Sequence, residues 1–492
     1  MAECNFDKGN EAHHATLYEK ALVRSCRASS VIASSKNGTP ASEEEIFKHF
    51  QIKDTHEAST KKLANLLNSR GIKLADPRIQ KSRELLRHFM RLRNGNKDTR
   101  HYKLSKQHFL ECVRPSIGLI TQAIQNNMII PSWQSFKSKM AEIFAQCREI
   151  KEGNVATYIP QLARQDPELW GMAVCTVDGQ RFGLGDSKEP FCFQSISKPF
   201  TYSVVSTDIG SDKVHEYIGQ EPSGRLFNEI CLDVCSKPHN PMVNAGAIIC
   251  TTLIRTGLCM ADRYDFIYNE YKKLAGGTYI GFDNATFLSE RNTASRNFAL
   301  AYFMKEKNCF PPGSSNLKQE LDLYFQLCSL ETDCESAAVM AATLANGGVC
   351  PLTDERCVSP RACRDVMSLM YSCGMYDYSG QFAFSVGLPA KSGVSGGLIL
   401  VVPNLMGICL YSPRLDRCGN TVRGVQFSQK MIEHFSLHNY DSLLHAEPKL
   451  DPRQDWNVGK DVAATEEPVV VKEEKTNDDA CIKKRHERRP KK

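Results

Sequence analysis

Ser195 and Lys198 are three residues apart at the start of an apolar segment, so a helix would place both side chains on one face. A neutral serine hydroxyl is a poor nucleophile and needs an adjacent base. Lysine can be that base when burial lowers its pKa, and Phe193 and Phe200 provide apolar surroundings. A helix N-terminus also disfavours an ammonium. The pair therefore predicts nucleophilic attack by serine with lysine as the base.

A second motif, Lys391-Ser392-Gly393, stands at the head of the expected strand Gly397–Val402. A Ser-x-x-Lys pair combined with a distant Lys-Ser-Gly segment is typical of serine enzymes that attack amides without histidine. Neither motif suffices alone, because Ser59–Lys62 and Ser315–Lys318 have the same spacing in segments with no other sign of chemistry. Alone, such a pair is better explained by a helix-capping serine and a solvated lysine.

Histidine is the usual base for a catalytic serine, yet His215 and His239 are the only histidines between residues 148 and 430. His239 lies in a turn between Pro238 and Pro241, where it is more suited to fixing a loop. A Ser-His-Asp triad is the weaker alternative, although His239 keeps it open.

The 492 residues exceed the size at which single cores usually stop growing, so we expect more than one domain. The net charge of +6 sits largely in a basic run at the C-terminus without aromatic residues, which indicates a solvated end and no nucleic-acid function. The twenty cysteines show no Cys-x-x-Cys and no zinc spacing, so we expect free thiols in a reducing compartment. No apolar run is long enough to predict a membrane span.

Changes in composition and apolar periodicity divide the chain into four parts. Residues 1–42 lack apolar periodicity and are expected to be disordered. Residues 43–147 show helical periodicity and open with a capping box from Ser42 to Glu45. This part resembles an EF-hand domain, but the loop at 93–99 contains Lys97 and lacks a closing acid, so we expect no calcium. Residues 148–445 form the expected catalytic domain, and 446–492 a disordered charged tail.

The catalytic part mixes strands and helices, which indicates an α/β fold. Four strands are expected in two hairpin-like pairs, one near each end of this part, with helices between them. This layout predicts an antiparallel sheet whose outer strands come from both ends of the domain. The expected strands are Trp170–Val177, Arg181–Gly185, Gly397–Val402 and Met406–Tyr411, and the expected helices are Pro199–Val205, Ala245–Thr256, Glu335–Ala345 and Pro360–Met370.

Several segments in order resemble those of the serine-dependent glutaminases, and more closely the animal kidney- and liver-type phosphate-activated enzymes. The resemblance covers roughly residues 45 to 445. It rests on Tyr158–Ala163, Gln194–Pro199, Pro238–Ala247, Ser289–Arg291 with Arg296-Asn297, Ser372–Tyr376, and Ala390–Val394. It implies a β-lactamase-like catalytic domain behind an EF-hand-like helical domain.

The resemblance also implies a role for each matching residue in the hydrolysis of L-glutamine to L-glutamate and ammonia, with no metal or organic cofactor. Ser195 would form an acyl-enzyme with Lys198 as its base, and Tyr376 would assist proton transfer. Tyr158 would lie against the Ser-Lys pair, and backbone N–H groups of Ser195 and Val394 would form the oxyanion hole. The expected substrate-binding residues are Gln194, Ser195, Asn244, Glu290, Asn297, Tyr324, Tyr376 and Val394.

Other implied properties are a homo-oligomer, dimer or tetramer, activated by phosphate and located in mitochondria. Glu229 and Cys231 replace a lysine and a phenylalanine of the kidney type, which bears on phosphate activation. Residues 20–42 contain no acid and many serines and basic residues, as in a transit peptide, but an acidic start precedes them. A cytosolic form is therefore the alternative.

Two other functions compete with a glutaminase. A penicillin-recognising type of amidase would use the same Ser-x-x-Lys and Lys-Ser-Gly motifs, but Glu290 and the asparagines suit a small charged amino acid better. A non-catalytic oligomeric scaffold is disfavoured because Ser195, Lys198, Tyr376 and Lys391 are all present.

Overall fold

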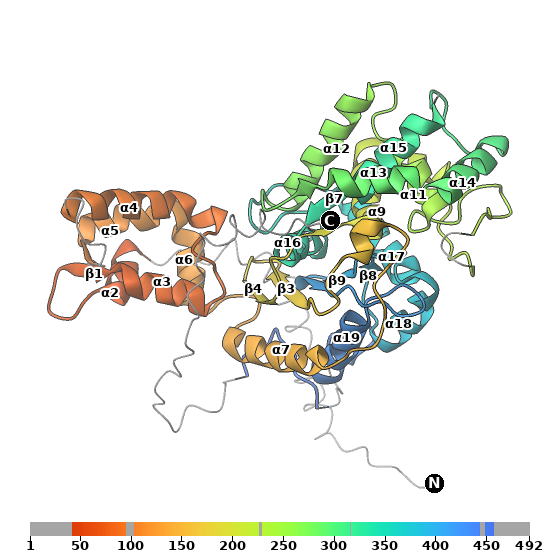
Figure 1. Cartoon of the computed structure of the whole chain (residues 1–492). Coiled ribbons are helices and arrows are strands. Elements are labelled where there is room, and N and C mark those ends of the chain that lie inside the picture. Colours follow the sequence, from red (N-terminus) through yellow and green to blue (C-terminus); the bar gives the residue numbers. More distant parts are fainter. Residues whose placement is uncertain (1–41, 95–102, 226–228, 315, 443–447, 457–492) are drawn as a thin grey trace, which may run out of the picture. The chain divides into compact units, whose positions relative to one another are not determined.

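The computed structural model describes residues 42–94, 103–225, 229–314, 316–442 and 448–456. Contacts divide the chain into one unit of Met1–Gln454 and another of Asp455–Lys492. All elements below belong to the first unit, and Figure 1 labels most of them. Among the described residues, no helix is both long enough and apolar enough to cross a membrane.

The N-terminal part of this unit is built from short helices. The capping box at its start is present, because the Glu45 N–H donates to Ser42 Oγ and the Ser42 N–H donates to Glu45 Oε2. The elements are α2 (Glu43–Phe50), β1 (Glu57–Ser59), α3 (Thr60–Ser69), η1 (Pro77–Ile79), α4 (Gln80–Asn94), β2 (Lys103–Ser105), α5 (Lys106–Val113), η2 (Arg114–Ser116) and α6 (Ile117–Ile124).

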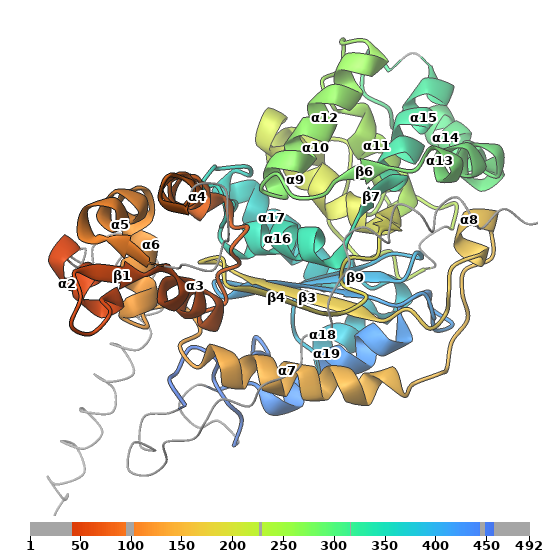
Figure 2. The ribbon, with the colours of Figure 1, turned by 60° about the vertical axis from the view of Figure 1, so that its left-hand side comes forward.

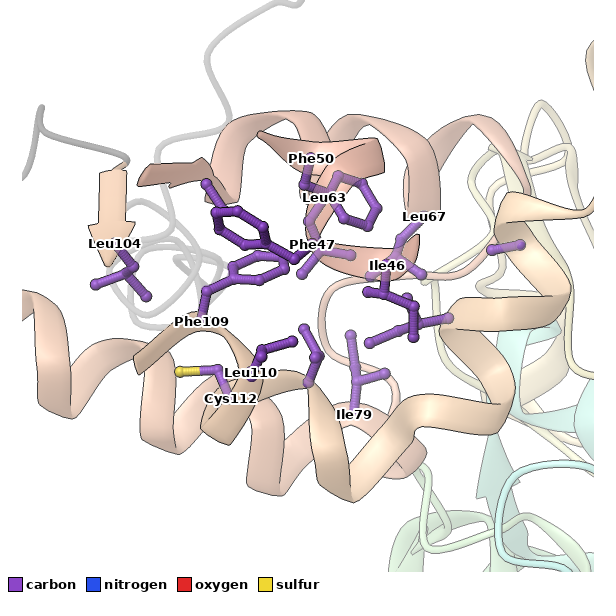
Figure 3. Close-up of a cluster of buried hydrophobic side chains, with 14 of the residues drawn as sticks. Ile46, Phe47, Phe50, Leu63, Leu67, Ile79, Leu104, Phe109, Leu110 and Cys112 are labelled. Carbon is purple, nitrogen blue, oxygen red and sulfur yellow. The ribbon is translucent and has the colours of Figure 1, made fainter. Parts of the chain in front are cut away.

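These helices enclose a core of their own, in which Phe47 and Phe50 of α2 meet Leu63 of α3 and Phe109 of α5 (Figure 3). The strands β1 and β2 pair antiparallel, with Ala58 opposite Leu104, and so connect the two halves of this part. Most of the loop that we expect to bind no calcium, residues 95–99, lies outside the described residues.

A five-stranded antiparallel sheet in the order β4-β3-β10-β9-β8 is the centre of the catalytic part. The two outer strands, β4 and β8, come from the two ends of this part, as expected. Between them, β3 pairs with β10 across more than two hundred residues of sequence. Every residue of β3, β9 and β10 is buried. The bounds are β3 (Gly171–Thr176), β4 (Arg181–Gly185), β8 (Ala390–Ser392), β9 (Gly397–Val402) and β10 (Met406–Tyr411).

The position expected for the Lys-Ser-Gly motif was wrong in one respect. Lys391 and Ser392 do not open the strand of Gly397–Val402 but form the separate edge strand β8, in which Lys391 lies opposite Ile399. The chain reverses between the two strands, and Gly396 has a φ of +100° there. A side chain at this position would collide with the carbonyl of Ser412, so only glycine suits the reversal.

Helices cover both faces of the sheet: α16 (Cys334–Ala345) packs on one face, and α7 (Trp133–Arg148) and α19 (Val422–His434) cover the other (Figure 2). The close approach of α16 depends on small residues. A side chain at Gly407 of β10 would collide with the backbone of Ala341 and Ala342. The alanines of α16 and the glycine of β10 therefore allow helix and sheet to touch at backbone distance.

The remaining elements lie between the first and last strands of the sheet. A second, three-stranded sheet has the order β5-β7-β6. The bounds are α8 (Pro160–Ala163), β5 (Phe191–Cys192), η3 (Gln194–Ile196), α9 (Ser197–Ile209), α10 (Ser211–His215), α11 (Asn244–Thr252), α12 (Met260–Leu274), β6 (Gly281–Phe282), α13 (Asn284–Asn292), α14 (Ser295–Glu306), α15 (Leu317–Cys328), β7 (Leu330–Thr332), α17 (Pro360–Cys373), η4 (Tyr376–Tyr378) and α18 (Ser379–Ser385).

A buried charge network joins the segment before α4 to the β3–β4 hairpin. Asp76 is fully buried and pairs with Arg78 at 3.0 Å and with Arg181 at 2.9 Å. Arg78 also donates to the carbonyl oxygens of Asp178 and Gly179 in the hairpin turn. Burial alone would raise the pKa of Asp76, but the hydrogen bond and charge of Arg78 and the charge of Arg181 lower it.

Replacing Asp76 with alanine should therefore destabilise the protein strongly, because two largely buried guanidinium groups would lose their carboxylate. Loss of one partner of a buried ion pair typically costs about 3 to 5 kcal/mol. Urea unfolding of Asp76→Ala measures this loss. The control Lys73→Met removes the half-exposed pair with Glu335, at 2.6 Å, and should cost less than about 1 kcal/mol. Equal losses in the two variants would contradict the importance of the buried network.

Candidate active site

Ser195 and Lys198 lie together at the start of α9, as their spacing predicts. Ser195 belongs to the 3-10 turn η3, and Lys198 lies in the first turn of the α-helix that follows it. Lys198 Nζ donates to Ser195 Oγ at 2.6 Å. Once the amine is neutral, the same contact allows the serine hydroxyl to donate its proton to Nζ. The geometry therefore suits a lysine that activates serine.

The surroundings of Lys198 that the structure describes bury its amine and form no salt bridge with it. Its side chain is buried, and the described residues contain no salt bridge to it. Burial lowers the pKa of Lys198 to about 8, although the neighbouring Cys328 and Glu290 raise it somewhat. The helix α9 is buried around its whole first half, which explains why its apolar sequence has no single apolar face. Burial thus brings the pKa of this amine closer to neutral pH, so the unprotonated form that the chemistry needs becomes accessible.

Glu290 of α13 reaches the same region. Its Oε1 accepts hydrogen bonds from Tyr158 Oη at 2.5 Å and from Gln194 Nε2 at 2.9 Å. Burial raises the pKa of Glu290, while these two hydrogen bonds and the charge of Lys198 oppose the rise. A buried carboxylate with neutral partners is suited to binding a cation such as a ligand ammonium. Among the described residues, the hydrogen bonds of Tyr158 go to Glu290 and, at 3.2 Å, to Gln194, and not to the Ser-Lys pair.

The other expected binding residues lie on neighbouring helices (Figure 1). Asn244, the first residue of α11, donates from Nδ2 to Asn297 Oδ1 of α14 at 3.2 Å. Tyr324 of α15 is buried, and Lys198 Nζ lies 6.0 Å from the centroid of its ring. The structure thus pairs the two amides with each other and places the phenol ring beside Lys198. Amides and phenols, with an acid such as Glu290, are the groups that a zwitterionic amino acid needs.

Tyr376 lies next to Ser195 although it is distant in sequence. It is buried, and burial raises the pKa of its phenol, an effect that a hydrogen bond with Ser195 opposes. Its backbone is unusual, with a φ of 54°, and Gln194 beside Ser195 has a φ of 49°. Left-handed conformations are rare for residues other than glycine and concentrate at functional sites. Both residues with a left-handed backbone thus lie next to the candidate nucleophile, Gln194 in sequence and Tyr376 in space.

Val394, expected to contribute to the oxyanion hole, lies in the turn between β8 and β9. The backbone hydrogen bonds within this turn run from Gly393 N to the Gly397 carbonyl and from Gly396 N to the Gly393 carbonyl. A side chain added at Gly393 would lie 3.0 Å from the carbonyl of Phe193 and 3.1 Å from Ile196. Glycine at this position therefore lets the turn approach the η3 backbone that carries Ser195.

The two histidines make contacts elsewhere. His215 Nε2 bonds with Tyr202 Oη at 2.7 Å, and His215 Nδ1 bonds with the carbonyl of Ile218. His239 lies in a turn, and its backbone carbonyl accepts a hydrogen bond from the Glu221 N–H. Within the described ranges, no hydrogen bond links a histidine to Ser195, and no group of three or more His, Cys, Asp and Glu side chains is arranged to hold a metal. These contacts favour lysine over histidine as the base.

A cavity of about 620 Å³ opens beside Tyr376. Arg225 and Glu229 contribute to its wall and form an ion pair with each other at 2.8 Å. Residues 226–228 of the segment that carries Glu229 and Cys231 lie outside the described residues.

Two neighbours of the site had no role in the sequence analysis. Cys328, the last residue of α15, is buried close to Lys198 and Tyr324. Asn420 donates from Nδ2 to the carbonyl of Met375 at 3.2 Å and so supports the turn of Tyr376. No motif marks either residue, because a single cysteine or asparagine has no spacing pattern to reveal it.

Comparisons with known proteins find similar sequences and structures over most of the chain. The family model described as Glutaminase matches residues 153–440, and a model described as EF-hand domain matches residues 42–131. The chain is 57% identical to putative glutaminase 2 of Caenorhabditis elegans, covering 84% of this chain and 69% of that protein. It is 48% identical to the mitochondrial liver isoform of glutaminase from Rattus norvegicus, covering 80% and 64%. The solved structure of the probable glutaminase ybaS matches 63% of this chain and 99% of its own, with 33% identity and a TM-score of 0.59.

Proposed function

Because the chain belongs to the glutaminase family, we propose that it hydrolyses L-glutamine to L-glutamate and ammonia, with Ser195 as the nucleophile and Lys198 as its base. The observation that carries the assignment of these roles is the 2.6 Å contact between Lys198 Nζ and Ser195 Oγ in a buried site. No step of the reaction draws on a metal or an organic cofactor.

The first half of the reaction forms an ester. Neutral Lys198 accepts the hydroxyl proton of Ser195, and Oγ attacks the side-chain carbonyl carbon of glutamine. The backbone N–H groups of Ser195 and Val394 bind the oxygen that becomes negatively charged. The carbon–nitrogen bond then breaks, and the leaving nitrogen takes up a proton through Tyr376 and Lys198 and departs as ammonia.

The second half regenerates the enzyme. A water molecule gives a proton to the same Lys198 and Tyr376 pair while its oxygen attacks the γ-glutamyl ester. The bond between the ester carbon and Ser195 Oγ breaks, Oγ regains its proton, and glutamate leaves.

Substrate recognition follows from the polar groups around the nucleophile. Glu290, held by Tyr158 and Gln194, binds the α-ammonium of glutamine. Asn244, Asn297 and Tyr324 bind its α-carboxylate, because amide and phenol groups donate hydrogen bonds to carboxylates.

The chain also has parts outside this site, for which we propose the following arrangement. The N-terminal segment ends near residue 42. The helical domain ends near residue 131 instead of the expected 147, and the catalytic domain continues to about residue 454 instead of 445. The packing of Trp133 and Phe136 against Phe182 supports the second boundary, and contacts of the first unit that extend to Gln454 support the third.

The enzyme assembles as a homo-oligomer, dimer or tetramer, with phosphate as an activator.

The mitochondrial name of the liver-type relatives supports a mitochondrial location for this chain. A fluorescent fusion of the full chain should then enter mitochondria, whereas one that lacks residues 1–42 should remain in the cytosol. Identical cytosolic signals from both fusions would contradict the proposal.

Ammonia release from glutamine tests the central assignment. Ser195→Ala should lower kcat by at least about 10³-fold, because no other group replaces the nucleophile. The control Ser203→Ala removes a buried hydroxyl from the same helix, which donates to the Phe200 carbonyl, and should keep activity within about twofold. Activity retained by a folded Ser195→Ala variant would exclude the mechanism.

The pH dependence tests the role of Lys198. Only its neutral form accepts a proton from Ser195, and this form prevails above its pKa. Since burial lowers that pKa to about 8 from an ordinary value of 10.5, kcat/KM should rise with pH through about 8 and then level off. A rising limb that appears only near the ordinary lysine value would show that the base is not the desolvated Lys198.

A further inference from the structure

Lys391 is a fully buried lysine on β8 to which the reaction assigns no part. Its Nζ donates to the carbonyl of Ser392 at 2.7 Å and to that of Gly374 at 3.0 Å, and lies 4.3 Å from the centroid of the Tyr376 ring. The described ranges contain no salt bridge to Lys391. Burying an amine without a carboxylate is costly, so a structural or functional gain must offset it.

The contacts of Lys391 converge on the turn that carries Tyr376. The carbonyl of Gly374, two residues before Tyr376, accepts from the Ser392 N–H at 3.2 Å as well as from Lys391 Nζ. A side chain at Gly374 would collide with the carbonyl of Ala390. The backbone of β8 therefore presses directly against this turn, and Lys391 extends the contact to the tyrosine ring.

Such support is needed because Tyr376 adopts a left-handed backbone, with a φ of 54°. This conformation is unfavourable for a residue with a side chain and persists only where the surroundings impose it. Ser379 Oγ donates to the Tyr376 carbonyl at 2.7 Å, and Asn420 holds the carbonyl of Met375. Lys391 is the residue in this group that contacts both the backbone of the turn and the aromatic ring.

We propose that Lys391 is a positioning residue for the hydrolysis, which holds the phenol of Tyr376 against Ser195 by anchoring the Gly374 carbonyl and covering the ring. This inference rests on the proposed function, in which Tyr376 transfers protons. Lys391 itself touches neither substrate nor the reacting atoms, so its whole effect on the rate passes through Tyr376.

A double-mutant cycle in the full-length chain tests this dependence, with glutamine as substrate and ammonia release as the readout. Lys391→Met should lower kcat by about 100-fold and change KM less than about threefold, because a misplaced catalytic group costs rate more than binding. In the Tyr376→Phe background, where the phenol hydroxyl is absent, Lys391→Met should lower kcat less than about threefold further.

Ser392→Ala is the matched control on the same strand. Its hydroxyl is buried without a hydrogen-bond partner in the described residues, and its removal should leave kcat within about twofold. Thermal unfolding of each variant separates loss of position from loss of fold. Where Lys391→Met does not fold, Lys391→Gln, which keeps an amide donor, replaces it in the same cycle and is judged by the same non-additivity.

The outcomes are distinct. An equal loss of kcat in both backgrounds would show that Lys391 supports the fold in general and would overturn the inference, as would an unchanged kcat in Lys391→Met. A loss in Tyr376→Phe together with full activity in Lys391→Met would refute only the positioning role. An unchanged kcat in Tyr376→Phe would refute the proton-transfer role of Tyr376, and the inference with it.

Discussion

The burial of Lys198 beside Ser195, without a carboxylate to neutralise it, is the constraint on which the site depends. In water the lysine would be protonated and could not accept a proton at neutral pH. An adjacent carboxylate would hold the ammonium in place and have the same effect. The protein instead surrounds the amine with the buried half of α9 and with Tyr324, and binds Glu290 through Tyr158 and Gln194. Burial without an ion pair lowers the pKa of the amine, and this is what makes it a base.

The sheet brings the other half of the site to this pair. The pairing of β3 with β10 joins the first hairpin, β3–β4, and the last hairpin, β9–β10, in one sheet. The short edge strand β8 and the turn of Tyr376 thereby come next to η3, where Ser195 lies. Small residues make these approaches possible, with Gly407 under α16, Gly374 against β8 and Gly393 against η3. The site is thus assembled from distant segments by close backbone packing.

Much of this arrangement follows from local sequence patterns. Spacing alone predicts the contact of Ser195 with Lys198, and the alternating and apolar runs predict β3, β4, β9 and β10 within a residue or two. The strand β8 was not predicted as a strand of its own, because three residues contain too little periodicity to separate it from the strand that follows. The left-handed backbone of Tyr376 and its support by Lys391 have no local signal, since they arise from tertiary contacts that override the intrinsic preference of the residue.

The central claim is that glutamine is cleaved through an ester on Ser195, with Lys198 as the base. Rapid acid quenching of the enzyme during turnover, followed by mass spectrometry of its peptides, tests this most directly. The account predicts a γ-glutamyl adduct on the peptide that contains Ser195, formed more slowly when Lys198 is replaced by alanine. An adduct on another residue, or ammonia release in a single turnover with no adduct on Ser195, would contradict it.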